Sequence, residues 1–326
     1  MVAFSSSSVK SQTAVVENAK PNDSDLIAFA SDTQAPMWVE TLWLKANNNR
    51  QATKKVFEDI MKKRPGSLYL LGDVVNLGYS NRQWKPIDRY LATLRNEGVG
   101  VHAILGNHEV MGQSMEGQRK FQKRFPDHVR TGYVQIKDSV AIVLLNSNFK
   151  KLSKEEVAKQ DAWYKATLQE LDNDPAIHFI ITACHHSPFT NSKIVGSSKD
   201  VQEKFVPAFL ASKKGKLFLS GHCHGFEHYK IEGKDFMVIG GGGGLHQPLR
   251  EGDGCLPDVA KDYKPLFHYL TVRRVDDHLE VKSIELKNDF TGFDEGLAFN
   301  INGYESSAIA VNTVQVNTPA SEQLKK

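Results

Sequence analysis

The chain is 326 residues long, which allows one large domain or two small ones. Hydrophobic residues make up 40% and charged residues 24%, and this balance excludes a wholly disordered chain, a collagen and a coiled coil. Lys and Arg total 41 against 38 Asp and Glu, so the net charge of +3 gives no support for a nucleic-acid partner.

Strand and helix patterns alternate along most of the chain. Residues 1–24 are rich in Ser, Lys, Asn and Asp, and we expect a flexible tail there. Strand patterns then lie at 26–30, 67–71, 99–105, 140–145, 177–183 and 216–219, and helix patterns at 49–63, 84–97 and 154–171. Residues 236–239, 268–275 and 279–286 alternate like paired antiparallel strands. The order predicts one α/β domain over 25–304, with a second tail over 305–326 whose Val-rich piece could add an edge strand.

The sequence carries no sign of export or of membrane insertion. No signal-peptide pattern opens it and no apolar run is long enough to span a bilayer. Three cysteines are too few for a disulfide scaffold, and reduced thiols are expected. We therefore expect a soluble cytoplasmic protein, although unconventional export would leave the same sequence pattern.

Five expected strands each stop at a short polar segment. These segments are Ser31-Asp32-Thr33-Gln34, Gly72-Asp73-Val74-Val75-Asn76, Gly106-Asn107-His108-Glu109, His185-His186-Ser187-Pro188 and Gly221-His222-Cys223-His224. Each segment alone could be a turn or a helix cap. Ligand sites in α/β sheets lie beyond the carboxyl ends of the strands, so the carboxylate, amide and imidazole groups are expected to meet at one rim. Mixed nitrogen and oxygen donors suit Mn, Fe, Zn or Co better than Mg or Ca.

This order of segments resembles the calcineurin-like metallophosphoesterase superfamily over about residues 26–286. The segment His186-Ser187-Pro188-Phe189 also resembles purple acid phosphatases and related enzymes. The resemblance implies a four-layer αββα sandwich of two mixed β-sheets, with the metal site at the carboxyl ends of the strands. The domain over 25–304 would then be catalytic and would hold two divalent ions, with Mn, Fe or Zn expected. It would hydrolyse a small-molecule phosphate monoester or diester with a metal-bridging hydroxide.

The resemblance also implies a role for each motif residue. Asp73 would bridge the two ions and act in catalysis. Asp32 and His224 would hold the first ion, with Gln34 at a position that is usually histidine. The second ion would be held by Asn107, His186 and His222. His108 would serve the leaving group as the catalytic acid.

The sequence departs from the family pattern at three positions. Gln34 either binds the first ion through its carbonyl or only hydrogen-bonds a metal-bound water. Asn76 stands where Asp usually orients the catalytic histidine, so a neutral amide would have to orient His108. Leu77 replaces the phosphate-binding arginine of phosphoprotein phosphatases. Gln34 and Asn76 support an alternative, a catalytically weak regulatory or binding protein that keeps the fold.

Several further residues have open roles. His186 is favoured over His185 as a ligand, because neighbours in a strand point to opposite faces and are not expected to bind one ion. Candidate substrate contacts are Asn76, Asn191, His246 and Arg250, with turn or capping roles as the alternative. The glycine run 240–244 is expected to line the metal cleft. Trp38, Trp43 and Trp84 could shape a pocket, with core packing as the expected role.

Overall fold

A computed structural model describes residues 23–303 of the chain. Most of the N-terminal tail expected over 1–24, and the tail expected over 305–326 with its Val-rich piece, lie outside the described residues. The first strand, β1 (Asp23–Ala30), begins inside the range expected to be a tail, and Asp23 pairs there with Pro65. Among the described residues, no helix is both long enough and apolar enough to cross a membrane.

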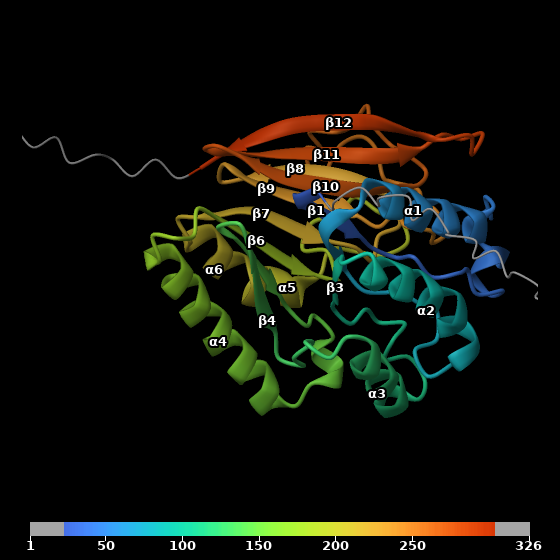
Figure 1. Cartoon of the computed structure of the whole chain (residues 1–326), viewed down its shortest axis with the longest axis horizontal. Helices are drawn as coiled ribbons and strands as arrows, with labels where there is room; N and C mark the ends of the chain where they lie inside the picture. Colours follow the sequence, from blue (N-terminus) through green and yellow to red (C-terminus); the bar gives the residue numbers. More distant parts are fainter. Residues whose placement is uncertain (1–22, 304–326) are drawn as a thin grey trace, which may run out of the picture.

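Two six-stranded mixed sheets form the centre of the molecule (Figure 1). The first has the order β12-β11-β10-β1-β2-β3, and β1, β2 and β3 run parallel. Its strands besides β1 are β2 (Pro65–Leu70), β3 (Gly100–Ala103), β10 (His268–Val275), β11 (His278–Leu286) and β12 (Phe293–Asn302). Antiparallel pairing of β10 with β1 attaches the late part of the chain beside the first strand.

The second sheet has the order β4-β5-β6-β7-β9-β8, in which β5, β6, β7 and β9 run parallel. Its strands are β4 (Tyr133–Lys137), β5 (Val140–Leu144), β6 (Phe179–Cys184), β7 (Gly215–Ser220), β8 (Phe226–Ile231) and β9 (Lys234–Ile239). All residues of β5 and β6 are buried, as expected for apolar strands covered on both faces.

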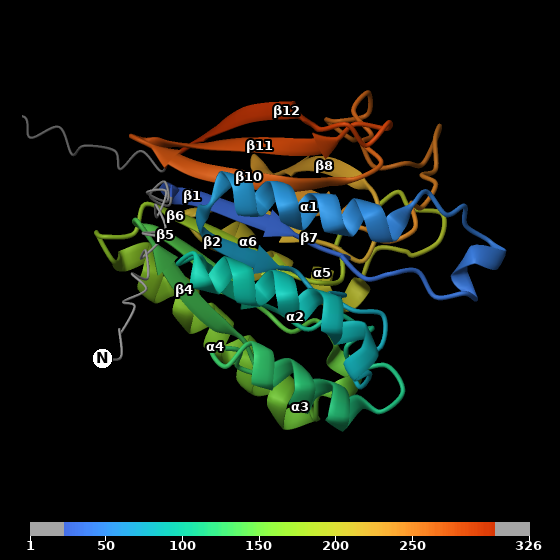
Figure 2. The ribbon, with the colours of Figure 1, turned by 45° about the vertical axis from the view of Figure 1, so that its right-hand side comes forward.

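Helices cover the outer face of each sheet. Figure 1 shows α1 (Asn49–Lys63), α2 (Asn81–Asn96) and α3 (Ser114–Arg124) on the right, and α4 (Lys154–Asn173) and α6 (Val206–Ala211) on the left. The remaining helix is α5 (Lys199–Lys204), and Figure 2 gives a second view of the same layers. Val56 of α1, Leu91 of α2 and Phe121 of α3 pack with the first sheet, and Leu168 of α4 and Phe209 of α6 pack with the second. A third apolar cluster lies between the sheets. The predicted four-layer αββα sandwich is confirmed.

The three tryptophans considered above have different environments. Trp84 is fully buried beside Phe121 and Phe125, so the expected core role is confirmed there. Trp38 is 77% exposed and Trp43 is 75% exposed, so core packing was the wrong expectation for both. They flank a short 3-10 turn (Glu40–Leu42) in the segment between β1 and α1, which projects from the body of the molecule (Figure 2).

Candidate dinuclear metal centre

The five polar segments meet at one rim, as their positions after strands predicted. They follow β1, β2, β3, β6 and β7, whose carboxyl ends meet where the two sheets adjoin. Asp32, Asp73 and His222 have positive φ angles of 58°, 48° and 66°. Such backbone is unfavourable for non-glycine residues and persists where the surrounding structure enforces it, often at functional sites.

One group of potential ligand atoms comes from Asp32, Asp73 and His224, whose atoms lie within 4.8 Å of one another. All three residues are buried. Asp32 accepts hydrogen bonds at Oδ2 from Ser31 Oγ at 2.6 Å and from the His222 amide at 2.9 Å. Its Oδ1 lies 3.4 Å from Nε2 of His224. Burial disfavours the imidazolium, but the Asp32 carboxylate raises the pKa of His224 above its ordinary value.

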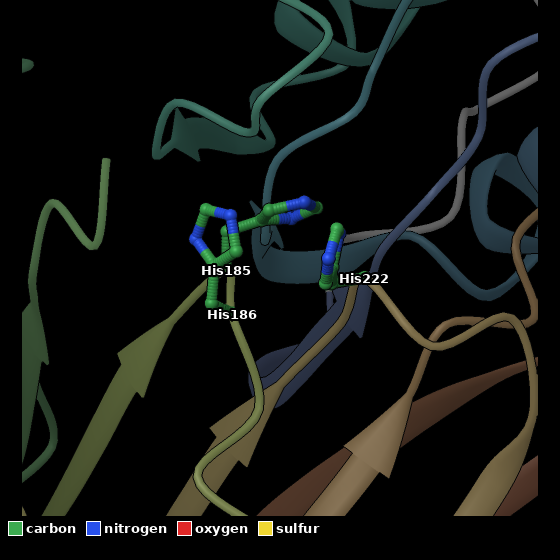
Figure 3. A group of neighbouring side chains, drawn as sticks. All are labelled: His185, His186 and His222. Atoms are coloured by element: carbon green, nitrogen blue, oxygen red, sulfur yellow. The ribbon is translucent and has the colours of Figure 1, made fainter. Parts of the chain in front are cut away.

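A second group consists of His185, His186 and His222, whose ligand nitrogens also lie within 4.8 Å of one another. Figure 3 shows the three rings gathered at the ends of the strands. Burial, together with the neighbouring imidazoles, lowers the pKa of His186 to about 3 and holds the pKa of His222 well below its usual range. Neutral imidazoles of this kind are the form that binds a metal ion.

Asp73 joins the two groups. Its Oδ2 lies 3.2 Å from Nε2 of His185, while its Oδ1 accepts the His108 amide at 2.8 Å. Burial alone would raise the pKa of this carboxyl, but the surrounding histidines hold it well below its usual range. Asp73 is therefore an anionic carboxylate between two sets of donors, the position that a bridging ligand requires.

His185 differs from its expected role. Strand β6 ends at Cys184, so the alternation of side chains within a strand does not govern His185 and His186. Nε2 of His185 lies 3.0 Å from Asn107 Oδ1 as well as beside Asp73, whereas Nδ1 of His186 pairs with Ser147 Oγ at 2.8 Å. The geometry brings both histidines to one group, with His185 next to two expected ligands.

Main-chain carbonyls fix the orientation of three histidines in the site. His185 Nδ1 donates to Leu71 O at 3.0 Å, and His108 Nδ1 donates to Asn76 O at 3.0 Å. In the same way, His224 Nδ1 donates to Leu245 O at 2.8 Å. Because a carbonyl oxygen only accepts, Nδ1 carries the hydrogen and Nε2 is presented to the site. In His185 that Nε2 faces two oxygen acceptors, so a proton or a cation must lie between them.

Gln34 lies within the first group. The hydrogen-bond network assigns the orientation of its amide: the side-chain nitrogen then donates to Asp73 O at 2.7 Å and to Asp32 O at 3.2 Å, and the oxygen lies 3.3 Å from Nε2 of His224. Two ligand atoms thus converge at a distance that a shared cation could occupy. The backbone of the two ligand loops holds the amide in this orientation, as it would have to for ligation through oxygen.

Asn76 does not orient His108 in the expected way. Its main-chain oxygen, and not its side-chain amide, accepts from His108 Nδ1. The side-chain nitrogen donates instead to Ala35 O at 3.0 Å, and Oδ1 has no donor among the described residues. The backbone supplies the contact, so the orientation of His108 does not depend on the side chain of Asn76.

Two buried carboxylates support the ligand loops, and sequence reasoning gave them no role. Glu109 accepts from the amides of Asp73 at 2.9 Å, Gly106 at 2.8 Å and Val75 at 3.1 Å. Burial and the nearby Asp73 raise the pKa of Glu109 to about 7. Glu227 accepts from Thr190 Oγ1, from the Asn191 amide and from Tyr229. In the sequence they are marked only by their positions: Glu109 directly follows His108, and Glu227 lies three residues after His224.

The other candidate substrate residues lie around a different cavity from the ligands. Asn191, His246 and Arg250 line a cavity of about 710 Å³ that none of the expected metal ligands lines. The side-chain amide of Asn191 is already engaged: its nitrogen donates to Leu256 O and its oxygen accepts from the main-chain amide of Leu256, both at 2.9 Å. Both ends of this side chain are therefore engaged within the protein. A cavity of about 480 Å³ is lined instead by Asn107, His186 and His222.

The glycine run 240–244 packs against the ligand loops. The amides of Gly242 and Gly244 donate to Ser31 O at 2.9 Å and to Asp32 O at 2.8 Å. A Cβ atom at Gly244 would lie 2.6 Å from the His224 ring. The run borders the site as expected, because only glycine lets the backbone approach His224 this closely.

The donor set fits two divalent ions. It combines two carboxylates, two amide oxygens and four imidazoles that present nitrogen atoms to one rim, with Asp73 common to both sides. Mixed nitrogen and oxygen donors with hydrogen-bonded outer partners are typical of Mn, Fe and Zn sites.

Comparisons with known proteins agree with the fold. A purple acid phosphatase from yellow lupin (Lupinus luteus) seeds has a TM-score of 0.64 at 15% identity, over 93% of this chain and 58% of that one. This chain thus spans just over half the length of that protein. The anchor in the inner membrane complex of Plasmodium has a TM-score of 0.63 at 15% identity, over 85% of this chain and 88% of that one. A dimetal phosphatase from Danio rerio has a TM-score of 0.53 at 15% identity, over 87% of this chain and 100% of that one.

At such identities these structures show a shared fold and nothing finer. No curated protein sequence matches the chain at a significant level. A family model described as calcineurin-like phosphoesterase matches residues 26–226, well over half of the chain. With the sandwich and the two ligand groups in place, the chain belongs to the calcineurin-like phosphoesterase family.

Proposed function

We propose that the protein hydrolyses a phosphate monoester or diester at a site that holds two divalent metal ions. The observation that carries the proposal is that Asp73 joins two groups of metal-binding side chains at one rim. Asp32, His224 and Gln34 would hold one ion, and Asn107, His185, His186 and His222 would supply the donors for the other. Mn, Fe and Zn suit these donors. When bound, such a pair of ions activates water and offsets charge on the phosphoryl oxygens.

His108 is the proposed acid for the leaving group. Its Nδ1 hydrogen is held by Asn76 O, so Nε2 is the nitrogen that exchanges a proton with substrate. That Nε2 lies 3.8 Å from Asp73 Oδ2, which places it at the edge of the ligand groups. A proton delivered there stabilises the alkoxide that leaves when the phosphorus–oxygen bond breaks.

A second candidate function is phosphate-ester binding with little turnover. Gln34 favours it, because a carboxamide oxygen would then be the donor that completes the Asp32 and His224 group. A first ion held by an amide in place of an imidazole would be held more weakly.

Metal reconstitution separates the two. The full chain, stripped of metal and reloaded with Mn, Fe, Zn, Ni or Mg, should hydrolyse aryl phosphate monoesters or diesters with at least one metal. Asp73→Asn should lower kcat/KM by roughly 100-fold or more, because the shared anionic ligand is lost. Glu170→Gln, at an exposed position of α4, is the control. Absence of turnover with every metal, or full activity in Asp73→Asn, would contradict the phosphoesterase proposal.

A further inference from the structure

A cavity of about 590 Å³ lies beside the metal centre, on the side of the Asp32 and Asp73 loops. Its walls come from the segment after β1, from the loop after β2 and from α2. Trp38, Pro86, Ile87 and Tyr90 form much of its apolar surface, and Arg50 and Arg82 reach it as well. We call this space the aromatic cavity. No expected metal ligand lines it, and the proposed mechanism gives it no part.

The backbone of the ligand loops connects the aromatic cavity to the site. The main-chain amide of Gln34 donates to Asp73 O at 3.1 Å, and Thr33 Oγ1 donates to Val74 O at 3.2 Å, so the two loops lie side by side. Thr33 and Val74 themselves line the cavity. The loops that carry Asp32 and Asp73 therefore also form one wall of the aromatic cavity.

Asn76 places the aromatic cavity next to His108. Its main-chain oxygen holds His108 Nδ1, while the residue itself lines the cavity. The group that leaves from phosphorus must lie near His108 to receive a proton. The aromatic cavity therefore lies one residue away from the ring that would serve the leaving group, on the Nδ1 side of that ring.

The side chains of the aromatic cavity select a particular kind of alcohol. Trp38 lines the cavity and is still 77% exposed, so a face of its indole is free to stack on a ligand. Tyr90 is already stacked on Phe57, with ring centroids 4.7 Å apart, and this fixes its orientation. Within residues 23–303, Arg50 and Arg82 form no ion pair, and Asn76 Oδ1 accepts no hydrogen bond. The guanidinium groups and the amide oxygen can therefore bind polar edges of a ligand.

We infer that the aromatic cavity binds the alcohol half of the substrate, and that this half carries a planar aromatic or heteroaromatic ring. The inference rests on the proposed phosphoesterase activity and narrows its substrate class. Phosphate esters of alcohols that bear a ring able to stack and to form hydrogen bonds are then preferred over esters of purely aliphatic alcohols.

Trp43 provides a matched control for Trp38. It lies in the same projecting segment and is 75% exposed, but it does not line the aromatic cavity. If Trp38 stacks on the substrate ring, Trp38→Ala should reduce the preference for ring-bearing esters and Trp43→Ala should not. Use of the whole segment to contact a membrane or another protein predicts equal effects of both variants.

Adenosine 5′-monophosphate and ribose 5-phosphate are suitable probes, because both are esters of a primary ribose hydroxyl and they differ by the aromatic base. The metal-loaded full chain should show a kcat/KM about tenfold higher for the nucleotide, the range expected for one stacked base. Trp38→Ala should remove that preference through KM and leave ribose 5-phosphate unaffected, while Trp43→Ala should keep it. Equal kcat/KM values for the two esters, or equal losses in the two variants, would overturn the inference.

A binding measurement keeps the inference testable apart from turnover. In saturation-transfer NMR with metal-free protein, the base protons of adenosine 5′-monophosphate should receive more saturation than its ribose protons. The excess should vanish in Trp38→Ala and persist in Trp43→Ala. Failure of hydrolysis with every metal would reject the proposed activity alone, whereas uniform saturation along the nucleotide would reject the aromatic cavity as its site.

Discussion

The carboxylate of Asp73 and the imidazole of His185 are the two side chains that connect the site at the residue scale. Their 3.2 Å contact links the Asp32–Asp73–His224 group to the three-histidine group. Nε2 of His185 also faces Asn107 Oδ1, and its own hydrogen is held on Nδ1 by Leu71 O. A neutral His185 leaves both acceptors without a donor, so either a proton on Nε2 or, when metal is bound, a metal ion lies between these groups.

Removal of the His185 side chain should therefore remove one metal ion. We expect His185→Ala to bind roughly one ion per chain where the native protein binds two, because Asn107 and Asp73 lose their nearest nitrogen donor. Plasma mass spectrometry of dialysed protein measures the stoichiometry, and the exposed His178→Ala serves as control. Two ions retained in His185→Ala, with one lost in His186→Ala, would assign the ligand to His186 alone.

The role of His108 has a separate signature. His108→Ala should lower hydrolysis of alkyl phosphates by roughly 100- to 10,000-fold, because their alkoxides need a proton. Hydrolysis of 4-nitrophenyl phosphate should fall much less, since 4-nitrophenolate leaves without one. Rates measured across leaving groups of graded pKa give the comparison. Losses of the same size for both classes would exclude the acid role.

At the scale of elements, the loops beyond the strands are held by backbone contacts and buried carboxylates. Glu109 gathers the loops after β2 and β3, and Glu227 at the start of β8 holds the Thr190–Asn191 turn that follows the histidine pair. The glycine run after β9 supports the Asp32 loop and the His224 ring. The ligand positions thus depend on elements from both halves of the chain.

The glycine run can be tested by one added methyl group. Gly244→Ala should displace His224, weaken the first metal site and cost about 2 kcal/mol of stability, because its Cβ would lie 2.6 Å from the ring. Gly225→Ala is the matched control, since nothing lies within 4 Å of a Cβ there. Metal titration with thermal unfolding measures both effects. A native-like metal affinity in Gly244→Ala would show that the run does not position His224.

For the molecule as a whole, two sheets and their helices bury polar as well as apolar groups. His268 of β10 is fully buried against the glycine run, beside Gly241. Neither of its ring nitrogens has a hydrogen-bond partner among the described residues. Burial, with the positive charges of His246 and Lys264 adding to it, lowers the pKa of His268 to about 3.

This histidine predicts a loss of stability in acid. Above pH 6.5 it is neutral in both the folded and the unfolded chain; as the pH falls, the unfolded chain takes up the proton first. Stability should therefore fall between about pH 6.5 and pH 3, by roughly 4 kcal/mol from this group. Urea unfolding of the native protein and His268→Phe over this range tests it, with His178→Phe as control. An unchanged pH slope in His268→Phe would contradict the prediction.

Much of the architecture was predictable because local patterns suffice for it. The apolar strands before Asp32, Asp73, Asn107 and His185, and the amphipathic helix 154–171, were found close to their true bounds. Missed elements include α3, β4, β8 and β12. In β12, exposed and partly exposed residues predominate, so its sequence (FDEGLAFNIN) carries no clear alternation. It becomes a strand because it pairs with β11, and the pattern of its own residues does not reveal that pairing.

The sequence by itself determined the donor types, their order and their placement after strands, since these follow from residue identity and from the carboxyl-end rule of α/β sheets. The tertiary structure decided where each side chain points. It placed His185 beside Asp73 and Asn107, gave the contact with His108 to the main chain of Asn76, tied the Asn191 amide to Leu256 and left Trp38 beside an open cavity. Side-chain direction in loops depends on contacts with residues far away in the chain, and no local period specifies them.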